Sequence, residues 1–220
     1  VGGKTAINVT QGKNLIGTFY QPRMVLADIA TLDSLPVREL RAGYGEVLKY
    51  GLINNLHFFE WLEQHGDNVL SKDPAAMRYA VKISCRSKAA IVAKDEREFS
   101  NRALLNFGHT FAHALEAECG YDGRLLHGEA VAIGLNMAFK LSSDLGLCSS
   151  QETDRLQRHL MEKGLPTTVD KIGIKGISPE AIVGHMRQDK KVMEGQLTFI
   201  LTRGIGRAFI EKNVEAEAVT

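Results

Sequence analysis

Histidines with the spacing of metal ligands lie near the middle of the chain. His109 and His113 stand four residues apart in a segment with helical periodicity, so both rings project from the same helix face. His127 follows the glycine-rich break 120–123, where the next helix is expected to begin. Two imidazoles from different helices and one distant carboxylate can form a three-ligand zinc site with an open position, as in catalytic zinc sites.

A simpler interpretation of these histidines stays open at this point. His-x-x-x-His pairs occur by chance on helices, and buried histidines often only satisfy backbone carbonyl groups. The Gly128-Glu129 pair directly after His127 favours a functional role only modestly. The decision therefore depends on the residues elsewhere in the chain.

A candidate for the carboxylate is Glu46, which lies three residues before Lys49 in an otherwise apolar predicted helix. The pair can be a surface ion pair of little energetic value. However, Gly43 and Gly45 lie beside it, and a glycine costs a helix roughly 1 kcal/mol relative to alanine. Such glycines permit close approach of another backbone or a ligand, so Glu46 could complete a Glu/His/His set.

A polar ridge is predicted on the histidine helix. Arg102, Asn106, His109 and His113 follow one another at intervals of three to four residues, with Lys88 and the charged run 94–98 before them. Burying such a ridge is costly unless a ligand pairs with it. A guanidinium and an amide suit an anionic substrate that carries hydroxyl groups.

Lysines also occur in three turns, at Lys4, at Lys13 beside Asn14, and at Lys190 and Lys191. Each turn is a weak signal, since most lysines in turns are solvated. Together they could supply the positive charge that a phosphate group needs.

These residues need a scaffold, and its periodicity is mainly helical. Apolar residues recur at helical spacing over 38–54, 57–66, 74–95, 104–119, 127–145, 150–163 and 179–187. The segments 6–9 and 15–20 read as a hairpin, 24–28 as a short buried strand, and 197–202 with 207–210 as a second hairpin. The predicted fold is therefore mainly α, a multi-helical domain with a C-terminal β-hairpin, preceded by a short remnant that contains strands.

The composition fits a globular protein of ordinary surface charge. The formal net charge is +1, which gives no support for nucleic acid or an anionic membrane as a partner. No apolar run approaches the roughly 18 residues of a membrane span. The three cysteines are scattered, which favours a reducing, cytoplasmic location. The chain begins with Val1 rather than methionine, so we expect a fragment that lacks an N-terminal part.

Several blocks of this sequence, in order, resemble the 3-dehydroquinate synthase family. They are GGKTAIN at 2–8, GKNLIGTFYQP at 12–22, GEVLKYG at 45–51, DERE at 95–98, LNFGHT at 105–110, LHGEA at 126–130 and DKK at 189–191. The resemblance implies that 1–35 is the end of a truncated N-terminal NAD-binding α/β domain. It implies that 36–220 is the helical domain that binds metal and substrate. The Gly-rich NAD-binding turn of the family is absent from the sequence.

The resemblance also implies roles for individual residues. Glu46, His109 and His127 correspond to the ligands of one divalent metal, zinc or cobalt. The residues that correspond to substrate contacts or proton-transfer groups are Asn14, Lys49, Lys88, Arg102, Asn106, His113 and Lys190 or Lys191, with Glu98 as a partner in the acid network. The residues that correspond to the NAD cleft are Lys4, Lys13, Thr31, Leu32, Asp33 and Ser34.

The implied reaction converts 3-deoxy-D-arabino-heptulosonate 7-phosphate, an anionic sugar phosphate, into 3-dehydroquinate and phosphate in the shikimate pathway. The implied full-length protein is a homodimer. Four alternatives stay open: another NAD- and metal-dependent sugar phosphate cyclase, a polyol dehydrogenase, a metal phosphohydrolase, and a metal-binding module without catalysis. The last follows if the chain lacks its NAD-binding half, and the fragment alone is then expected to be inactive.

Overall fold

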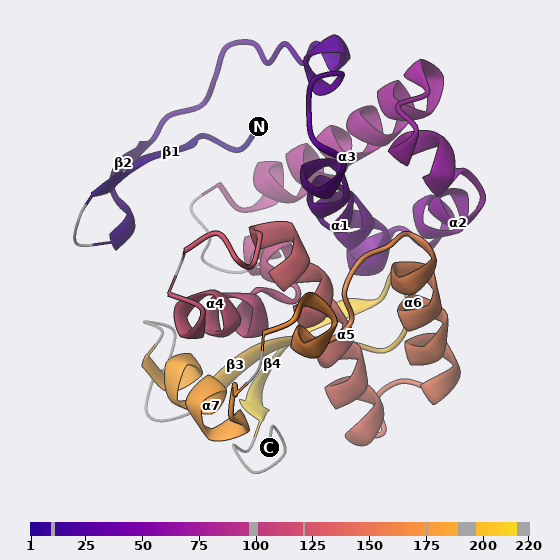
Figure 1. The fold of residues 1–220 in the computed structure, drawn as a ribbon. Helices are drawn as coiled ribbons and strands as arrows, with labels where there is room; N and C mark the ends of the chain where they lie inside the picture. Colours follow the sequence, from indigo (N-terminus) through magenta and orange to yellow (C-terminus); the bar gives the residue numbers. More distant parts are fainter. Residues whose placement is uncertain (10–11, 97–100, 121, 175, 189–196, 215–220) are drawn as a thin grey trace.

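Helices follow one another from Val37 to Gln188 in the computed structural model of the protein, with a β-hairpin at either end (Figure 1). The structure describes residues 1–9, 12–96, 101–120, 122–174, 176–188 and 197–214. The mainly helical fold with a C-terminal hairpin is confirmed. Among the described residues, no helix combines the length and the apolar composition that a membrane span requires.

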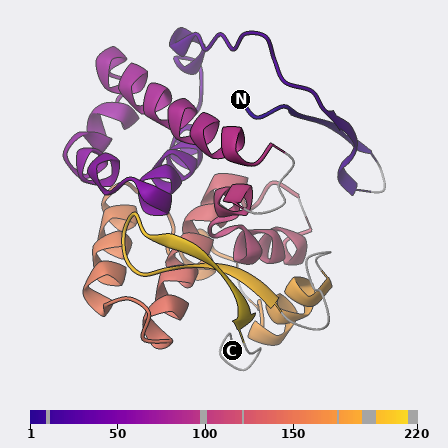
Figure 2. The same cartoon turned by 180° about the vertical axis from the view of Figure 1, so that it is seen from behind.

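The N-terminal hairpin consists of β1 (Lys4–Val9) and β2 (Gly12–Phe19), which pair antiparallel with Ile7 opposite Ile16. It confirms the predicted hairpin, and it stands beside the helical body in both views of the fold (Figures 1 and 2). Much of its apolar surface is exposed, including both isoleucines of this pair.

The predicted buried strand at 24–28 is wrong. This segment has no strand structure, and Met24 and Leu26 are 78% and 84% exposed. A short apolar run becomes a buried strand only where neighbouring strands pair with it, and in the described part of the chain none does. The segment leads instead into a short 3-10 helix, η1 (Ile29–Leu32), whose first turn is capped by the Asp28 carboxylate.

Three helices form the first half of the helical body: α1 (Val37–Asn54), α2 (Leu56–Leu70) and α3 (Pro74–Lys94). Side chains cap the later two helices, because Asn55 accepts a hydrogen bond from a backbone N–H of α2 and Asp73 does so for α3. All three elements lie where the sequence predicted them, with ends that differ by a few residues.

The predicted continuous helix over 104–119 is wrong in its first part. The chain forms a 3-10 helix, η2 (Asn101–Asn106), and then α4 (His109–Glu118). Between them Gly108 adopts a left-handed conformation with φ of 77°. A Cβ at this glycine would lie 2.8 Å from the backbone nitrogen of Leu135, so the break lets the chain pack directly on the next helix.

The remaining helices and strands, apart from the short 3-10 helix η3 (Val169–Ile172), agree with the predicted positions to within a few residues. They are α5 (His127–Asp144), α6 (Ser150–Glu162), α7 (Pro179–Gln188), β3 (Leu197–Thr202) and β4 (Ala208–Val214). Helix α5 is the centre of the core, since it contacts α1, α4, α6 and β3. Most of its residues from Gly128 to Leu135 are fully buried.

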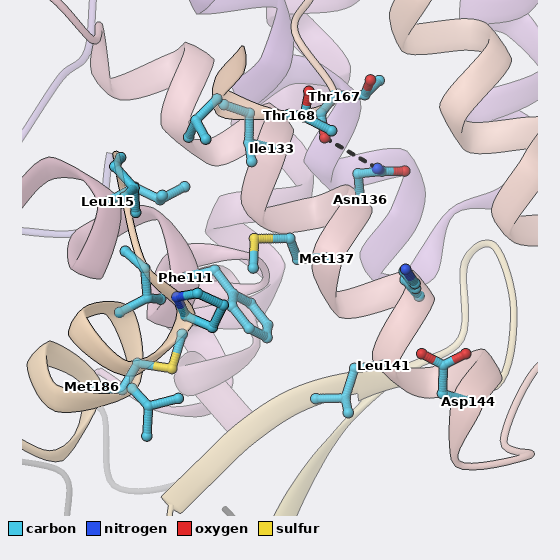
Figure 3. A pocket seen from close by; sticks show the side chains of 16 residues that line it. Phe111, Leu115, Ile133, Asn136, Met137, Leu141, Asp144, Thr167, Thr168 and Met186 are labelled. Carbon is cyan, nitrogen blue, oxygen red and sulfur yellow. Dashed lines mark hydrogen bonds between the residues drawn. The ribbon is translucent and has the colours of Figure 1, made fainter. Parts of the chain in front are cut away.

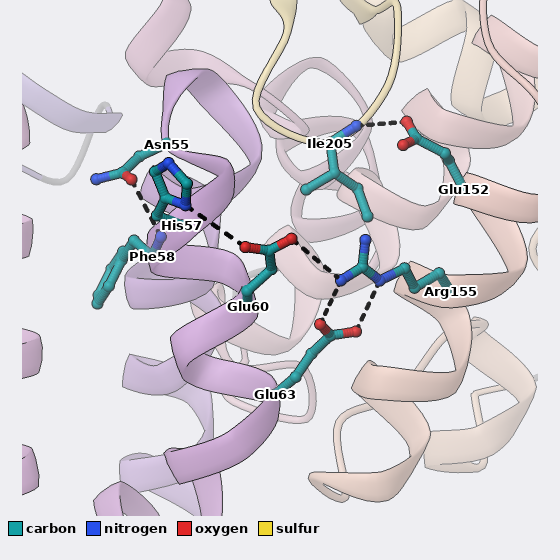
Figure 4. A network of polar contacts seen from close by, with 8 residues as sticks. All are labelled: Asn55, His57, Phe58, Glu60, Glu63, Glu152, Arg155 and Ile205. Atoms are coloured by element: carbon teal, nitrogen blue, oxygen red, sulfur yellow. Dashed lines mark hydrogen bonds and ion pairs between the residues drawn. The ribbon is translucent and has the colours of Figure 1, made fainter.

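An ion-pair network ties α6 to α2 and to the β3–β4 turn (Figure 4). The Arg155 guanidinium binds both carboxylate oxygens of Glu63, at 2.8 Å and 2.5 Å. Glu152, on the same helix as Arg155, accepts a hydrogen bond of 2.7 Å from the backbone of Ile205. The network therefore fixes the position of α6 from two sides.

A buried histidine should make the fold sensitive to acid. Burial lowers the pKa of His159, which forms a 3.0 Å hydrogen bond with the Tyr44 hydroxyl, to about 4. In the unfolded chain this histidine takes up a proton below about pH 6.5, whereas in the folded chain it stays neutral down to about pH 4. The stability of the fold therefore falls as the pH drops from about 6.5 to about 4. We expect this residue to contribute roughly 3 kcal/mol to the loss, since each pKa unit is worth about 1.4 kcal/mol.

Urea unfolding of wild type and His159→Gln at pH 7 and at pH 4.5 measures this contribution. The variant should lose less stability between the two pH values than the wild type does. An equal loss in both proteins would contradict the assignment.

Candidate metal centre

Helices α1 and α5 touch through their backbones at two glycines. A Cβ on Gly128 would lie 1.9 Å from the carbonyl oxygen of Ala42, and a Cβ on Gly45 would lie 2.8 Å from the carbonyl oxygen of Gly128. Any larger residue would push the helices apart. The crossing therefore brings together the neighbours of the two glycines, Glu46 on α1 and His127 at the start of α5.

Helix α4 approaches α5 in the same way. A Cβ on Gly134 would lie 2.1 Å from the carbonyl oxygen of Gly108, so here too the backbones are in direct contact. His109 follows Gly108 directly and is the first residue of α4. Two glycine contacts on one central helix thus set the positions of three side chains from three helices.

These three side chains, Glu46, His109 and His127, form a cluster suited to a cation. The Nε2 atoms of His109 and His127 each lie 3.4 Å from the same carboxylate oxygen, Oε1 of Glu46. One candidate ligand atom from each residue lies within 4.8 Å of the others. The oxygen is buried but makes no hydrogen bond. A buried carboxylate oxygen without a hydrogen bond, between two imidazole nitrogens, fits zinc or a similar divalent ion.

Lys49 holds the other oxygen of the carboxylate. Its ammonium lies 2.7 Å from Oε2 of Glu46 and donates a 2.6 Å hydrogen bond to the carbonyl oxygen of Leu105. Burial lowers the pKa of Lys49, and the charge of Glu46 offsets part of this effect. Burial would raise the pKa of Glu46, but the contacts with both histidines and the charge of Lys49 outweigh burial and lower it, so the carboxylate is ionised.

Contacts at the opposite ring nitrogens orient the two imidazoles. Nδ1 of His109 lies 3.1 Å from the carbonyl oxygen of Phe107, and Nδ1 of His127 lies 3.3 Å from the Glu116 carboxylate. Because a carbonyl can only accept, Nδ1 of His109 carries the proton and Nε2 is left as the ligand atom. Contacts with Glu116 and Glu46 raise the pKa of His127 to about 9, so a metal ion must displace a proton there.

Glu116 is a site residue that the sequence analysis missed. It is 6% exposed and lies on α4, seven residues after His109. Residues seven apart share a helix face, so the helical spacing from His109 is the signal that could have found it. Glu116 joins the cluster only because α5 begins beside this face of α4.

His113 stands at the edge of the cluster. Its ring centroid lies 5.4 Å from that of His109 and 6.2 Å from that of His127, and the residue is exposed. It is not part of the three-residue group of candidate ligands.

The predicted polar ridge is wrong as a feature of one helix, because Arg102 and Asn106 belong to η2 rather than to α4. Arg102 is 3% exposed, and its guanidinium donates hydrogen bonds to the carbonyl oxygens of Gly2 and Glu96. The Lys88 side chain also lies beside Gly2, and its charge is near enough to Lys49 to lower the pKa of Lys49. Lys88 is therefore near both Arg102 and Lys49, and Lys49 contacts the cluster through Glu46.

The residues predicted for the cofactor cleft lie elsewhere in the N-terminal segment. Lys4 is exposed on β1, and residue 13 belongs to β2, as does residue 14, which was predicted as a substrate contact. The segment 31–34 covers the end of η1 and the following turn, where the Lys72 ammonium donates to the carbonyl oxygen of Asp33. Three further predicted residues lie outside the described part of the chain: Glu98, Lys190 and Lys191.

A separate cavity of about 420 Å³ lies between α4, α5 and α7 (Figure 3). Its lining is mostly apolar and includes Phe111, Met137 and Met186. None of the predicted site residues lines it. The metal cluster, rather than this cavity, therefore carries the chemistry that the sequence indicated.

Comparison with known families agrees with this site. The family model for the C-terminal part of 3-dehydroquinate synthase matches residues 43–192, and the model for the N-terminal part matches residues 1–42. The chain belongs to the 3-dehydroquinate synthase family. Glu46, His109 and His127 all fall in the C-terminal family match.

Individual relatives extend the comparison. The 3-dehydroquinate synthase of Rhodospirillum rubrum is 53% identical over 220 residues, which cover all of this chain and 57% of that protein. Other curated relatives of the same name are covered to 58–59% of their length, so the chain spans less than two thirds of the proteins it matches.

Two solved structures share the fold. The first is a 2-epi-5-epi-valiolone synthase from Streptomyces hygroscopicus subsp. jinggangensis with NAD⁺ and Zn²⁺ bound. It has a TM-score of 0.86 and 27% identity, over 100% of this chain and 59% of that chain. The second is a 2-deoxy-scyllo-inosose synthase complexed with carbaglucose-6-phosphate, NAD⁺ and Co²⁺. It has a TM-score of 0.83 and 26% identity, over 99% of this chain and 62% of that chain.

Proposed function

We propose that the chain is the metal- and substrate-binding part of a 3-dehydroquinate synthase. The substrate is then 3-deoxy-D-arabino-heptulosonate 7-phosphate and the products are 3-dehydroquinate and phosphate. The observation that carries the proposal is the Glu46 oxygen between two imidazole nitrogens, in a chain of this family. Membership of the family supports the proposed reaction, and the Glu46, His109 and His127 cluster supports its dependence on a metal ion.

Glu46, His109 and His127 would hold the divalent ion, zinc or cobalt. Such an ion, when bound, polarises substrate hydroxyl groups and makes them more acidic. Lys49 keeps the Glu46 carboxylate turned toward the histidines. The buried cationic charge of Lys49 and Arg102, with Lys88 nearby, favours an anionic substrate and restricts its orientation.

Other roles in the proposal rest on the family resemblance. His113, exposed at the edge of the cluster, would transfer protons at the phosphate side. Asn106 would contact substrate, and Asn14 with Lys190 or Lys191 would bind the phosphate. Glu98 would support the acid network. NAD would bind beside Lys4, Lys13 and the segment 31–34, with residues 1–35 as the end of the NAD-binding domain and 36–220 as the helical domain.

The second candidate is a cyclase for a different sugar phosphate, favoured by the two solved structures of other carbocycle synthases. The 53% identity to a 3-dehydroquinate synthase favours the first proposal over this one.

The test is NAD-dependent phosphate release by the product of the complete gene that contains these residues. Release from the heptulosonate phosphate but not from glucose 6-phosphate is expected. Release only from glucose 6-phosphate would favour the second candidate.

We also propose that the 220 residues by themselves bind metal but do not complete the reaction. The sequence lacks a Gly-rich turn that would hold the NAD pyrophosphate, and hydride transfer needs both cofactor and substrate in one cleft. Calorimetry with NAD should detect no micromolar binding, and a phosphate assay should detect no turnover. Sustained turnover would refute this expectation. A cytoplasmic location and a homodimeric complete protein are part of the same proposal.

A further inference from the structure

The start of α5 needs a firm anchor if His127 is to be a metal ligand. His127 is the first residue of the helix, and its side chain is 47% exposed, so packing around the ring does not hold it on all sides. First turns of helices also lack internal hydrogen bonds for their N–H groups. Something else must therefore fix this helix end relative to Glu46.

Arg38 supplies that anchor from the first turn of α1. Its Nε lies 2.7 Å from Oε1 of Glu129 and its Nη2 lies 2.7 Å from Oε2 of the same carboxylate. Glu129 is 6% exposed. Nη2 also donates a 2.6 Å hydrogen bond to the carbonyl oxygen of Arg124. Glu129 in turn accepts a 2.9 Å hydrogen bond from the backbone N–H of Leu126. One guanidinium thus holds the two segments on either side of His127.

The same face of α1 carries the rest of the contact. Arg38, Ala42 and Gly45 follow at helical spacing, and the last two are the residues that touch Gly128. Glu46 comes next on this helix, roughly 12 Å along the axis from Arg38 at about 1.5 Å per residue. The ion pair and the glycine contact therefore join α1 to α5 at two separate points, which restricts how the two helices can move relative to each other.

We propose that Arg38 and Glu129 are positioning residues that hold His127 against Glu46 for metal binding. The inference rests on the proposed function of the cluster as a divalent metal site. Neither residue contacts the candidate ligand atoms, so the effect passes through the backbone of 124–129. Loss of such a supporting contact typically weakens metal binding by roughly 10–100-fold.

Titration of the metal-free chain with Co²⁺ tests the inference, because the visible absorption of cobalt reports ligand geometry as well as binding. The variant is Arg38→Met. The matched control is Arg155→Met, which removes a similar two-contact Arg–Glu pair between α6 and α2 (Figure 4). We expect Arg38→Met to bind Co²⁺ roughly 10–100-fold more weakly with an altered spectrum. Arg155→Met should keep the affinity and spectrum of the wild type.

Two conservative variants keep the test decisive if Arg38→Met does not fold. Arg38→Lys retains the charge but not the two-oxygen contact, and Glu129→Gln retains an acceptor for Leu126, so both should show intermediate affinity. Equal Co²⁺ affinity and spectra in wild type and all Arg38 and Glu129 variants would overturn the positioning role alone. Equal losses in the Arg38 and Arg155 variants would overturn it too, as a general stability effect. Failure of the wild type to bind Co²⁺ would overturn the metal site itself.

Discussion

Replacement of Glu46 or His127 with alanine is expected to abolish stoichiometric binding of a divalent ion while the helical fold is kept. Each substitution removes one of three candidate ligands. The loss should exceed the roughly 10–100-fold that removal of a supporting residue causes. Elemental analysis of the dialysed proteins measures the metal, and circular dichroism measures the helix content.

His113→Ala is the matched control for this prediction. Its ring is stacked with that of His127 and edge-on to that of His109, but the residue is not in the three-ligand group. It should retain about one equivalent of metal. Full metal content in both Glu46→Ala and His127→Ala would disprove the assignment, and loss in His113→Ala alone would move it to another histidine.

Replacement of Gly128 with alanine is expected to have the second-largest effect, although no functional group is lost. The added methyl would lie 1.9 Å from the carbonyl oxygen of Ala42, so α1 and α5 must separate. Overpacking of this kind costs roughly 1–3 kcal/mol in stability. Because the separation also moves Glu46 from His127, the metal should be lost together with the stability.

Gly43→Ala is the control for Gly128→Ala. Gly43 also lies in α1, but a Cβ there would meet no atom within 4 Å. We expect about 1 kcal/mol of added stability, from better helix propensity, and unchanged metal binding. Thermal unfolding and metal titration of both variants give the comparison. If Gly128→Ala does not fold, Gly45→Ala takes its place, because its Cβ would lie 2.8 Å from the carbonyl oxygen of Gly128 and the clash is therefore milder. Normal metal affinity in a folded Gly45→Ala protein would refute the role of the crossing.

The sequence predicted the three candidate ligands better than the contacts that hold them in place. The helical periodicity located α1, α4 and α5 to within a few residues, apart from the break at Gly108, and the residue types of Glu46, His109 and His127 indicated metal chemistry. Gly45 stood out because a glycine inside a helix needs a reason. The supporting contacts of Arg38 and Glu116 depend on which helix faces meet, and one sequence does not specify that.

The wrong predictions also arise where contacts between distant segments decide the local structure. The break between η2 and α4 follows from the direct contact of Gly108 with α5, and periodicity along one segment does not reveal contact with another. The exposed segment 24–28 is apolar enough for a strand, but strand formation depends on a partner. Local pattern thus predicted elements, and long-range packing decided where they end and what they touch.

The two histidines of the cluster are the first residues of α4 and α5, and this has an electrostatic consequence. Helix side chains lean toward the N-terminus, and the N-terminal end of a helix carries a partial positive charge. Both imidazoles thus extend into a region that repels cations, where Glu46 supplies the negative charge among the three candidate ligands. A divalent ion held there would keep an excess of positive potential, which would favour a negatively charged oxygen as its next ligand. The helix ends would therefore weaken the binding of the ion but strengthen its preference for an ionised oxygen ligand.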